Sequence, residues 1–343
     1  MRFLAVLLFP IALLYDLVTR FRNHLYNVGY KRSFSFQTNV IAVGNLSVGG
    51  TGKTPMVEYI VRLLRGKYHI TTLSRGYGRR TKGYRLAHND DTAKTIGDEP
   101  FQFYNKFKDI NVAVCEERAL GIPFILVDRP ETEVILLDDA FQHRSVKPQL
   151  NLMLTDFNNL FYNDLVLPVG RLRESRKGAS RADIIIVTKC PKNEDQIPFG
   201  EIQDFMRKYN AKADVFFSGI KYGSLIPFEG AGPLKSKLIV FSGLASSRNF
   251  VEHLRSNYEV KEHFDFNDHH MYSPKEIKKL LELSGDECSL ITTEKDMVKL
   301  IQPQFKSLLR DKSIYYLTIE SYFLKDGKRF DSIIQNSILQ YSN

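Results

Sequence analysis

The chain has 343 residues, more than one average domain, and its net charge of +9 is typical of proteins that meet phosphate on nucleotides, nucleic acids or lipid headgroups. With 43% hydrophobic and 25% charged residues, the composition excludes an intrinsically disordered chain. The cysteines are few and widely separated, which excludes a disulfide framework and a paired-cysteine zinc site and indicates a reducing compartment: Cys115, Cys190 and Cys288.

Residues 1–32 predict a membrane-associated helix with a basic flank. Residues 3–14 are uncharged and almost wholly apolar, and basic and aromatic side chains follow as far as Arg32. A bilayer span needs about 20 apolar residues, so this shorter run favours a helix that lies at a membrane surface. A signal peptide and an ordinary buried helix are the alternatives, although no small-x-small cleavage site follows the apolar run.

The next part of the chain, residues 33–220, predicts a P-loop NTPase-like core with a mostly parallel sheet and helices on both faces. Aliphatic runs alternate there with helical stretches, which is the rhythm of strands joined by crossover helices. The strands are expected at 39–43, 69–73, 110–114, 134–137, 150–154 and 183–187. The run 184–187 has no polar position and predicts a strand in the middle of the sheet.

Residues 221–343 predict a second, smaller α/β domain, whose strands follow a stretch rich in Gly and Pro at 223–233. Strands are expected there at 238–241, 289–292 and 314–319. Ser273 and Glu276, with Pro274 between them, form a capping-box pattern that predicts a helix start.

The strongest local signal is a strand, a glycine-rich turn and a helix in the order of a phosphate-binding loop. Converging backbone N–H groups and the helix dipole there bind an anion, Lys53 is expected to reach the outer phosphates of ATP, and Thr54 to hold Mg²⁺. Ser47 stands where the general pattern has its first glycine. The predicted ATP-binding residues are Val48, Gly49, Gly50, Thr51, Gly52, Lys53, Thr54 and Pro55.

Two adjacent carboxylates end the strand expected at 134–137. Asp138 and Asp139 fit the Walker B arrangement, in which an acid at the carboxyl end of a strand orients Mg²⁺ near Thr54; capping of a following helix is the alternative. Asp98 opens another predicted helix and, taken alone, reads as an N-cap. His269, taken alone, receives no role from the sequence pattern.

Six blocks together resemble the tetraacyldisaccharide 4'-kinase family of lipid A biosynthesis, which also carries Ser at the position of Ser47. The resemblance spans nearly the whole chain. The blocks are GNLSVGGTGKTP (44–55), LSRGYGR (73–79), GDEP (97–100), DDAFQHR (138–144), LPVGRLRE (167–174) and TTEKD (292–296).

The resemblance implies transfer of the γ-phosphate of ATP to the 4'-hydroxyl of a tetraacyldisaccharide 1-phosphate, at the cytoplasmic face of the inner membrane of a Gram-negative bacterium. It implies that Asp98 and His269 form a catalytic pair that works with Lys53, and that the acceptor is a lipid at a membrane surface. The residues expected to contact the substrate or its phosphates lie in or beside the six blocks: Asn45, Arg75, Tyr77, Arg118, Gln142, Arg171 and Arg173. For each of these arginines, a solvated surface position is the alternative.

Two other classes of protein compete with this hypothesis. One is a P-loop GTPase or ATPase switch that regulates a partner. Guanine readout would mark the GTPase, but Pro191 stands after Thr188-Lys189-Cys190 where the N/T-K-x-D motif has its aspartate. A nucleic-acid-binding protein would account for the pI of 9.2; however, nothing pairs the basic stretch 171–181 with stacking aromatics or a recognition helix. We therefore expect no nucleic acid partner.

Overall fold

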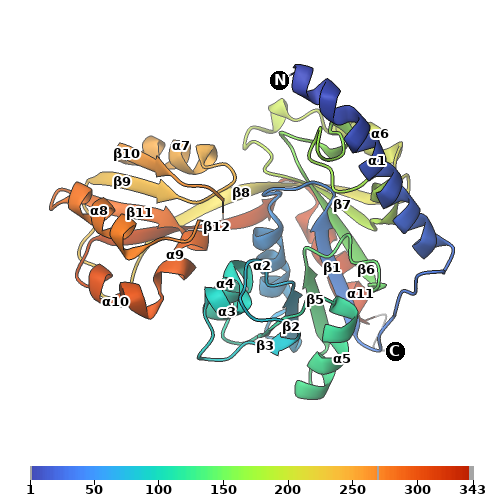
Figure 1. Ribbon diagram of the computed structural model, residues 1–343, viewed down its shortest axis with the longest axis horizontal. Helices are drawn as coiled ribbons and strands as arrows, with labels where there is room; N and C mark the ends of the chain where they lie inside the picture. The colour runs from blue at the N-terminus through green and yellow to red at the C-terminus, as the bar shows by residue number, and fades with distance from the viewer. Residues whose placement is uncertain (1, 269, 340–343) are drawn as a thin grey trace.

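The computed structural model describes residues 2–268 and 270–339 and has two lobes along one continuous sheet of 12 strands (Figure 1). The strand order is β10-β9-β11-β12-β8-β7-β6-β1-β5-β2-β4-β3. The strands are β1 (Asn39–Asn45), β2 (Ile70–Ser74), β3 (Arg85–Leu86), β4 (Asn111–Val114), β5 (Val134–Asp138), β6 (Leu150–Asp156), β7 (Ile184–Thr188), β8 (Asp214–Pro227), β9 (Lys237–Ser242), β10 (Glu259–Asp265), β11 (Cys288–Thr293) and β12 (Ile314–Phe323).

Helices connect most of these strands. They are α1 (Arg2–Asn27), α2 (Lys53–Leu64), α3 (Ala93–Ile96), α4 (Asp98–Lys106), α5 (Arg118–Asp128), α6 (Phe199–Arg207), α7 (Arg248–Asn257), α8 (Pro274–Ser284), α9 (Glu294–Leu300), α10 (Pro303–Leu309) and α11 (Gly327–Leu339). Short 3-10 helices cover Phe161–Asn163, Arg176–Arg181 and Glu194–Gln196.

The first lobe holds β1 to β7 between two helical layers. Successive residues of a strand point to opposite faces, so Ile41 and Val43 of β1 join the core beneath α2, while Val40 and Ala42 pack toward α5. Neighbouring strands from β7 to β4 are parallel, and β3 is antiparallel. The expected α/β class with a mostly parallel sheet is confirmed, and β7 lies inside the sheet between β6 and β8 as predicted.

The second lobe contains β9 to β12 and α7 to α10. Its strands are parallel to one another, and α8 begins with the predicted capping box between Ser273 and Glu276. A core of Ile239, Phe241 and Leu290 fills the face beneath α8, α9 and α10.

One long strand joins the lobes. The first residues of β8 pair in parallel with β7, and its later residues pair antiparallel with β12, so the predicted boundary at residue 221 falls inside this strand (Figure 1). After β12 the chain returns to the first lobe. Phe330 and Ile334 of α11 belong to the core of that lobe, and Tyr59 of α2 donates a hydrogen bond of 2.8 Å to Asp331. Both lobes therefore depend on β8 and β12.

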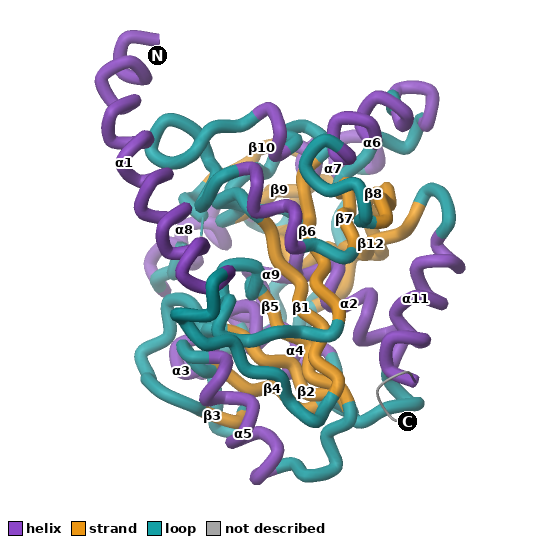
Figure 2. The backbone as a smooth tube through the Cα atoms, turned by 90° about the vertical axis from the view of Figure 1, so that its right-hand side faces the viewer, coloured by secondary structure: helices purple, strands orange, loops and turns teal. Residues whose placement is uncertain are grey.

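Helix α1 runs along one edge of the molecule (Figure 2). No helix among the residues described combines the length and apolar character that a bilayer crossing requires. The side that faces the protein is largely polar: Tyr15, Arg22 and Asn23 all donate hydrogen bonds to residues of the first lobe. The outward side is apolar and exposed, and includes Leu7, Ile11, Leu14, Leu17, Val18 and Phe21.

Candidate functional site

The phosphate loop connects β1 to α2 at the carboxyl end of the central strands. Gly49 and Gly52 adopt φ of 96° and 79°, values that glycine reaches without strain. At position 44 a glycine is required by lack of space, because a Cβ there would lie 2.6 Å from the backbone nitrogen of Phe141. This close approach brings the turn after β5 against the start of the loop.

Lys53 is the first residue of α2 and faces the end of β5. Its Nζ lies 3.5 Å from Asp139 Oδ1 and donates a hydrogen bond of 3.3 Å to Asn45 Oδ1. Arg173 approaches the same carboxylate with both terminal nitrogens, at 2.7 Å and 3.0 Å, and also donates to Asn45. Burial alone would raise the pKa of Asp139, but the charges of Lys53 and Arg173 outweigh it and hold that pKa well below its usual range. Asp139 is therefore a fixed negative charge beside the loop.

The pKa of Asp138 is shifted in the opposite direction. Its side chain is fully buried, and burial together with the negative charges of Glu99 and Asp139 raises its pKa to about 7. Ser74 at the end of β2 reaches its Oδ2 at 3.5 Å, and no residue in the described part of the chain donates a hydrogen bond to its Oδ1. A buried carboxylate oxygen in this state favours a bound cation.

The residue types at this end of the sheet fit a hard divalent cation. Asp138 and Asp139 supply carboxylate oxygens, and Thr54 follows Lys53 at the start of α2, so the donor set is oxygen only, as Mg²⁺ requires. No group of three or more His, Cys, Asp or Glu side chains that could hold a metal occurs among the described residues. Such a site would therefore depend on phosphate oxygens and water to complete the coordination shell, which is usual for Mg²⁺.

Arg118 is placed differently from the other predicted arginines. It is fully buried and donates hydrogen bonds to the backbone carbonyls of Cys115 and Asp138, at 2.8 Å and 3.1 Å. Burial lowers its pKa to about 10, with the charge of Asp138 acting in the opposite direction. In this arrangement the guanidinium supports the end of β5 from within the protein.

The loop after β2 lies directly against the start of α4. Gly97 has a φ of 95°, and a Cβ on it would lie 3.1 Å from the Cα of Gly76. This contact brings the loop that carries Arg75 and Tyr77 against the residue before Asp98. The side chains of Arg75 and Tyr77 are exposed, and Asp98 is 8% exposed. The loop with two predicted substrate residues and the start of the helix with the predicted catalytic acid are thus in contact, although they come from separate blocks of the sequence.

Glu174 organises a group of polar residues behind the phosphate loop, a role that sequence reasoning missed. Its carboxylate accepts both terminal nitrogens of Arg181, at 2.7 Å and 2.9 Å, and the side-chain amide of Gln142 at 2.9 Å. Gln142 also donates to the backbone carbonyl of Asn45. Asn23 of α1 completes the group with a hydrogen bond of 2.6 Å to Glu174 Oε2. Helix α1 is therefore attached to the residues that support the loop.

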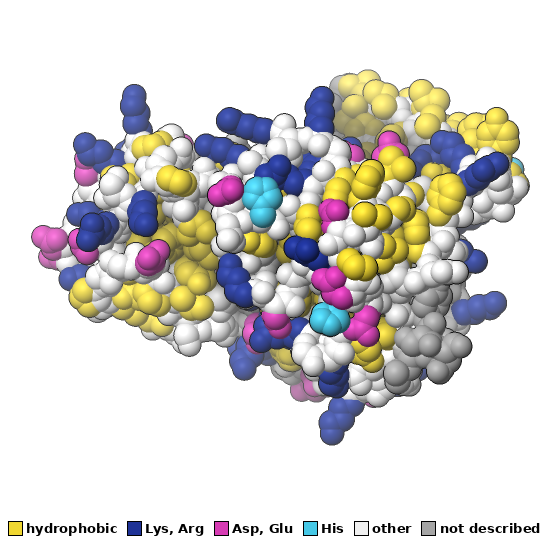
Figure 3. Space-filling model, turned by 90° about the horizontal axis from the view of Figure 1, so that it is seen from below, with side chains coloured by type: hydrophobic (Ala, Val, Ile, Leu, Met, Phe, Trp, Pro, Cys, Tyr) yellow, Lys and Arg dark blue, Asp and Glu magenta, His cyan; other side chains and the backbone are white. Residues whose placement is uncertain are grey.

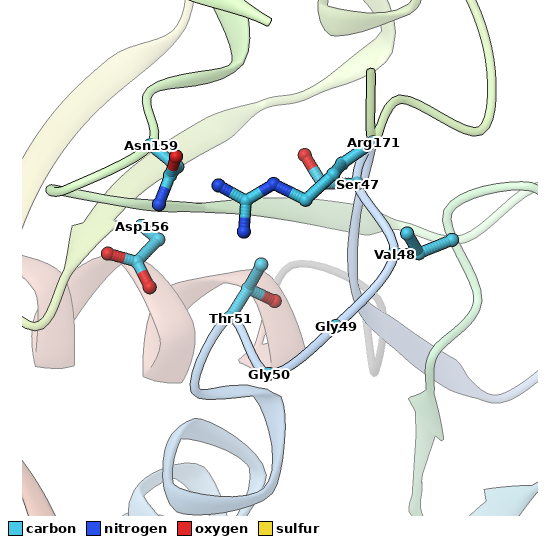
Figure 4. A pocket seen from close by; sticks show the side chains of 8 residues that line it. All are labelled: Ser47, Val48, Gly49, Gly50, Thr51, Asp156, Asn159 and Arg171. Carbon is cyan, nitrogen blue, oxygen red and sulfur yellow. The ribbon is translucent and has the colours of Figure 1, made fainter. Parts of the chain in front are cut away.

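Arg171 lies on the outer side of the phosphate loop. Figure 4 shows its side chain extending over Thr51 toward Asp156 and Asn159. Its backbone carbonyl accepts a hydrogen bond of 2.8 Å from Val48, and its Nε lies 3.6 Å from Asp164. Lys189, just after β7, donates to the carbonyl of Gly50 and pairs with Asp156 at 2.7 Å. The small hollow here is lined by Ser47, Val48, Gly49, Gly50, Thr51, Asp156, Asn159 and Arg171.

His269, predicted as the partner of Asp98, lies outside the described residues. Its neighbour Asp268 is paired with Lys295 of α9 at 3.1 Å. The second lobe also contributes residues that no local pattern marked, because Lys299 of α9 lies 3.8 Å from Asp98. Ion pairs between residues so distant in the chain leave no local signature.

The chain is similar to known proteins over nearly its whole length. Residues 4–339 match the family model of tetraacyldisaccharide-1-P 4'-kinase. The tetraacyldisaccharide 4'-kinase of Flavobacterium psychrophilum is 45% identical over 98% of this chain and 98% of its own, and that of Flavobacterium johnsoniae is 44% identical over 99% and 98%. The crystal structure of LpxK from Aquifex aeolicus in complex with ATP has a TM-score of 0.76 and 27% identity, and covers 98% of this chain and 99% of that one.

Proposed function

The chain belongs to the tetraacyldisaccharide 4'-kinase family, and from this premise we propose how its own residues carry out the reaction. It is an ATP-dependent kinase of lipid A biosynthesis that phosphorylates tetraacyldisaccharide 1-phosphate. The observation that carries the proposal for the site is the convergence of Lys53, the Asp138–Asp139 pair and Asp98 at one edge of the sheet, with Lys53 3.5 Å from Asp139. A phosphate-binding lysine, a metal-binding acid pair and a candidate base are the parts that phosphoryl transfer needs.

The phosphate loop binds the triphosphate of ATP. Backbone N–H groups of residues 48–54 and the N-terminus of α2 surround the phosphates, and the Lys53 ammonium balances the charge that develops on the transferred group. Thr54, Asp138 and Asp139 are the residues that would hold Mg²⁺. When bound, Mg²⁺ neutralises phosphate charge and orients the outer phosphates.

Asp98 accepts the proton of the 4'-hydroxyl. The hydroxyl oxygen forms a bond to the γ-phosphorus, the bond from that phosphorus to the bridging oxygen of ADP breaks, and the proton passes to the Asp98 carboxylate. His269 is the proposed partner that orients Asp98, as the family resemblance implies. Burial of Asp98 at 8% exposure supports the assignment, because a base shielded from water keeps its orientation.

The acceptor binds across the loops beside Asp98. Arg75 and Tyr77 lie in the loop against the start of α4 and have exposed side chains, which supports their proposed contact with the sugar and its 1-phosphate. Arg171 extends over the outer side of the phosphate loop. The other predicted substrate residues act through the loop itself. Asn45 accepts hydrogen bonds from Gln142, Arg173 and Lys53. Arg118 supports the end of β5 by donating to the backbone carbonyl of Asp138.

We assign membrane contact to the outward side of α1. A helix that presents polar residues to the protein and leucine, isoleucine and phenylalanine to the outside is reversed relative to an ordinary surface helix, and this pattern fits a lipid interface. Figure 3 shows hydrophobic atoms gathered at the upper right of that view, with Lys and Arg side chains around the margin. Basic residues at the edge of an apolar surface suit the anionic lipids of a cytoplasmic leaflet, which supports a position at the cytoplasmic face of the inner membrane.

Charged residues on the outward side of α1 should weaken membrane binding. Leu14 and Val18 are 64% and 59% exposed, so the double variant Leu14→Glu/Val18→Glu disturbs little packing. Sedimentation with anionic phospholipid vesicles should show a loss of affinity of roughly tenfold or more, because two inserted apolar side chains are replaced by charges. Leu283→Glu, at a residue of α8 that is 47% exposed, is the matched control and should bind like wild type. Equal binding by all three proteins would exclude α1 as the contact.

The proposed transfer is tested with γ-labelled ATP, Mg²⁺ and tetraacyldisaccharide 1-phosphate in detergent. We expect the label at the 4' position of the lipid, and none when the acceptor already carries a 4'-phosphate. Release of labelled phosphate without any labelled lipid would show hydrolysis instead of transfer and would contradict the proposal.

A further inference from the structure

Helix α9 of the second lobe lies along α4 of the first lobe, and α4 carries Asp98 at its first position. Between the helices, the buried side chain of Val298 packs with Ile96 and Phe101. At the far end, Glu294 of α9 pairs with Lys106 of α4 at 2.7 Å, and Lys106 pairs with Glu58 at the same distance. The two helices are thus held together along their length.

At the near end of this contact, Lys299 of α9 reaches Asp98. Its Nζ lies 3.8 Å from Asp98 Oδ2 and 2.9 Å from Asp296 Oδ1, and the side chains of Lys299 and Asp296 are both 0% exposed. The other oxygen of Asp296 accepts hydrogen bonds from Gly243 N at 2.9 Å and Thr293 Oγ1 at 2.8 Å. Asp296 therefore fixes the ammonium in one position.

We infer that Lys299 is a positioning residue for Asp98 in the phosphoryl transfer. Out of water, an ammonium and a carboxylate at this distance attract each other strongly, so Lys299 restrains the Asp98 carboxylate and balances its charge. A separation of 3.8 Å is too long for a hydrogen bond, so Lys299 does not take a lone pair that the acceptor hydroxyl needs. The inference rests on the proposed role of Asp98 as the base.

A purely structural role for Lys299 is the competing explanation. A buried lysine beside a buried aspartate can simply neutralise it, and removal of one partner leaves an uncompensated charge that destabilises the fold. The two explanations differ in what happens when Asp296 is neutralised as well. If Lys299 only neutralises Asp296, it is no longer needed once Asp296 is replaced by a neutral residue. If Lys299 positions Asp98, its loss still lowers activity in that background.

The experiment compares Lys299→Met, Asp296→Asn and the double variant Lys299→Met/Asp296→Asn. In the double variant no charge is left unpaired at position 296, so it is expected to fold even where Lys299→Met does not, and its fold is verified by circular dichroism. We expect the double variant to have a kcat roughly 10- to 100-fold below that of Asp296→Asn, because a misplaced catalytic group costs that much. The KM for ATP should stay within about twofold, because ATP is assigned to the other lobe.

Lys278→Met, at an exposed lysine of α8, is the matched control and should leave both constants unchanged. A double variant as active as Asp296→Asn would overturn the positioning role, since Lys299 would then serve only to neutralise Asp296. Parallel measurement of Asp98→Asn separates the two proposals. If Asp98→Asn remains active, the assignment of the base fails; if it is inactive while the double variant keeps the kcat of Asp296→Asn, only the inference on Lys299 fails.

Discussion

Asp98→Asn should lower kcat by about a thousandfold while the KM for ATP stays nearly constant. Asparagine has the shape of aspartate but cannot accept the proton of the sugar hydroxyl, and general base catalysis contributes roughly 10²- to 10⁴-fold. The fold should tolerate the change, because Lys299 keeps its hydrogen bond of 2.9 Å to Asp296. Steady-state kinetics with ATP and the lipid acceptor varied in turn would measure the effect.

A suitable control for this variant is Asp90→Asn. The Asp90 side chain is 96% exposed and lies in the loop before α3, so its loss should leave kcat at the wild-type value. Retention of more than about a tenth of the activity by Asp98→Asn would show that another group takes the proton, since a smaller loss falls below the range for a general base.

Asp138→Asn should make the enzyme more stable and much less active. In the folded protein the pKa of Asp138 is raised to about 7 from the ordinary aspartate value of 3.8. The folded state therefore holds a proton that the unfolded chain has already released, and wild type loses stability as pH rises through this window up to about 7. The variant avoids this loss, so its gain in stability without metal should be larger at pH 8 than at pH 5, on the order of 1–4 kcal/mol.

Activity should move in the opposite direction, falling roughly 10²-fold or more, because an amide is a weaker ligand for Mg²⁺ than a carboxylate. Urea denaturation in EDTA at the two pH values, with kinetics in Mg²⁺ and ATP, would measure both effects. Asp286→Asn, at an exposed loop position, should change neither. An Asp138→Asn protein less stable than wild type at pH 8 would contradict the inference that Asp138 carries an uncompensated buried charge when no cation is bound.

The parts of the site that follow one another in the chain were predictable from the sequence. The strand before Gly44, the glycines of the turn and the helix after Lys53 each have a local physical reason, and so has the acid pair at the end of β5. Their convergence follows from the rule that parallel strands present their carboxyl ends at one edge of a sheet. The α/β class and the central place of β7 could be derived in the same way.

The remaining features depend on contacts between distant parts of the chain. Nothing near Lys299 marks it as a neighbour of Asp98, and nothing near Glu174 predicts that it gathers Arg181, Gln142 and Asn23. The burial of Arg118 was equally hidden, because a helix-start arginine reads as a surface residue until its carbonyl partners are known. Strand β8 escaped prediction since its two halves face different partners and share no single hydrophobic pattern.

The path of β8 also determines how the protein unfolds. The strand contributes Phe216 to the interior of one lobe and continues into the ladder of the other, while α11 returns to seal the first interior with Phe330. Neither half can lose its structure without exposing an unpaired backbone edge and apolar surface on its neighbour. Denaturation should therefore be a single cooperative event, and truncation after β7 would remove part of the core that supports the nucleotide loop.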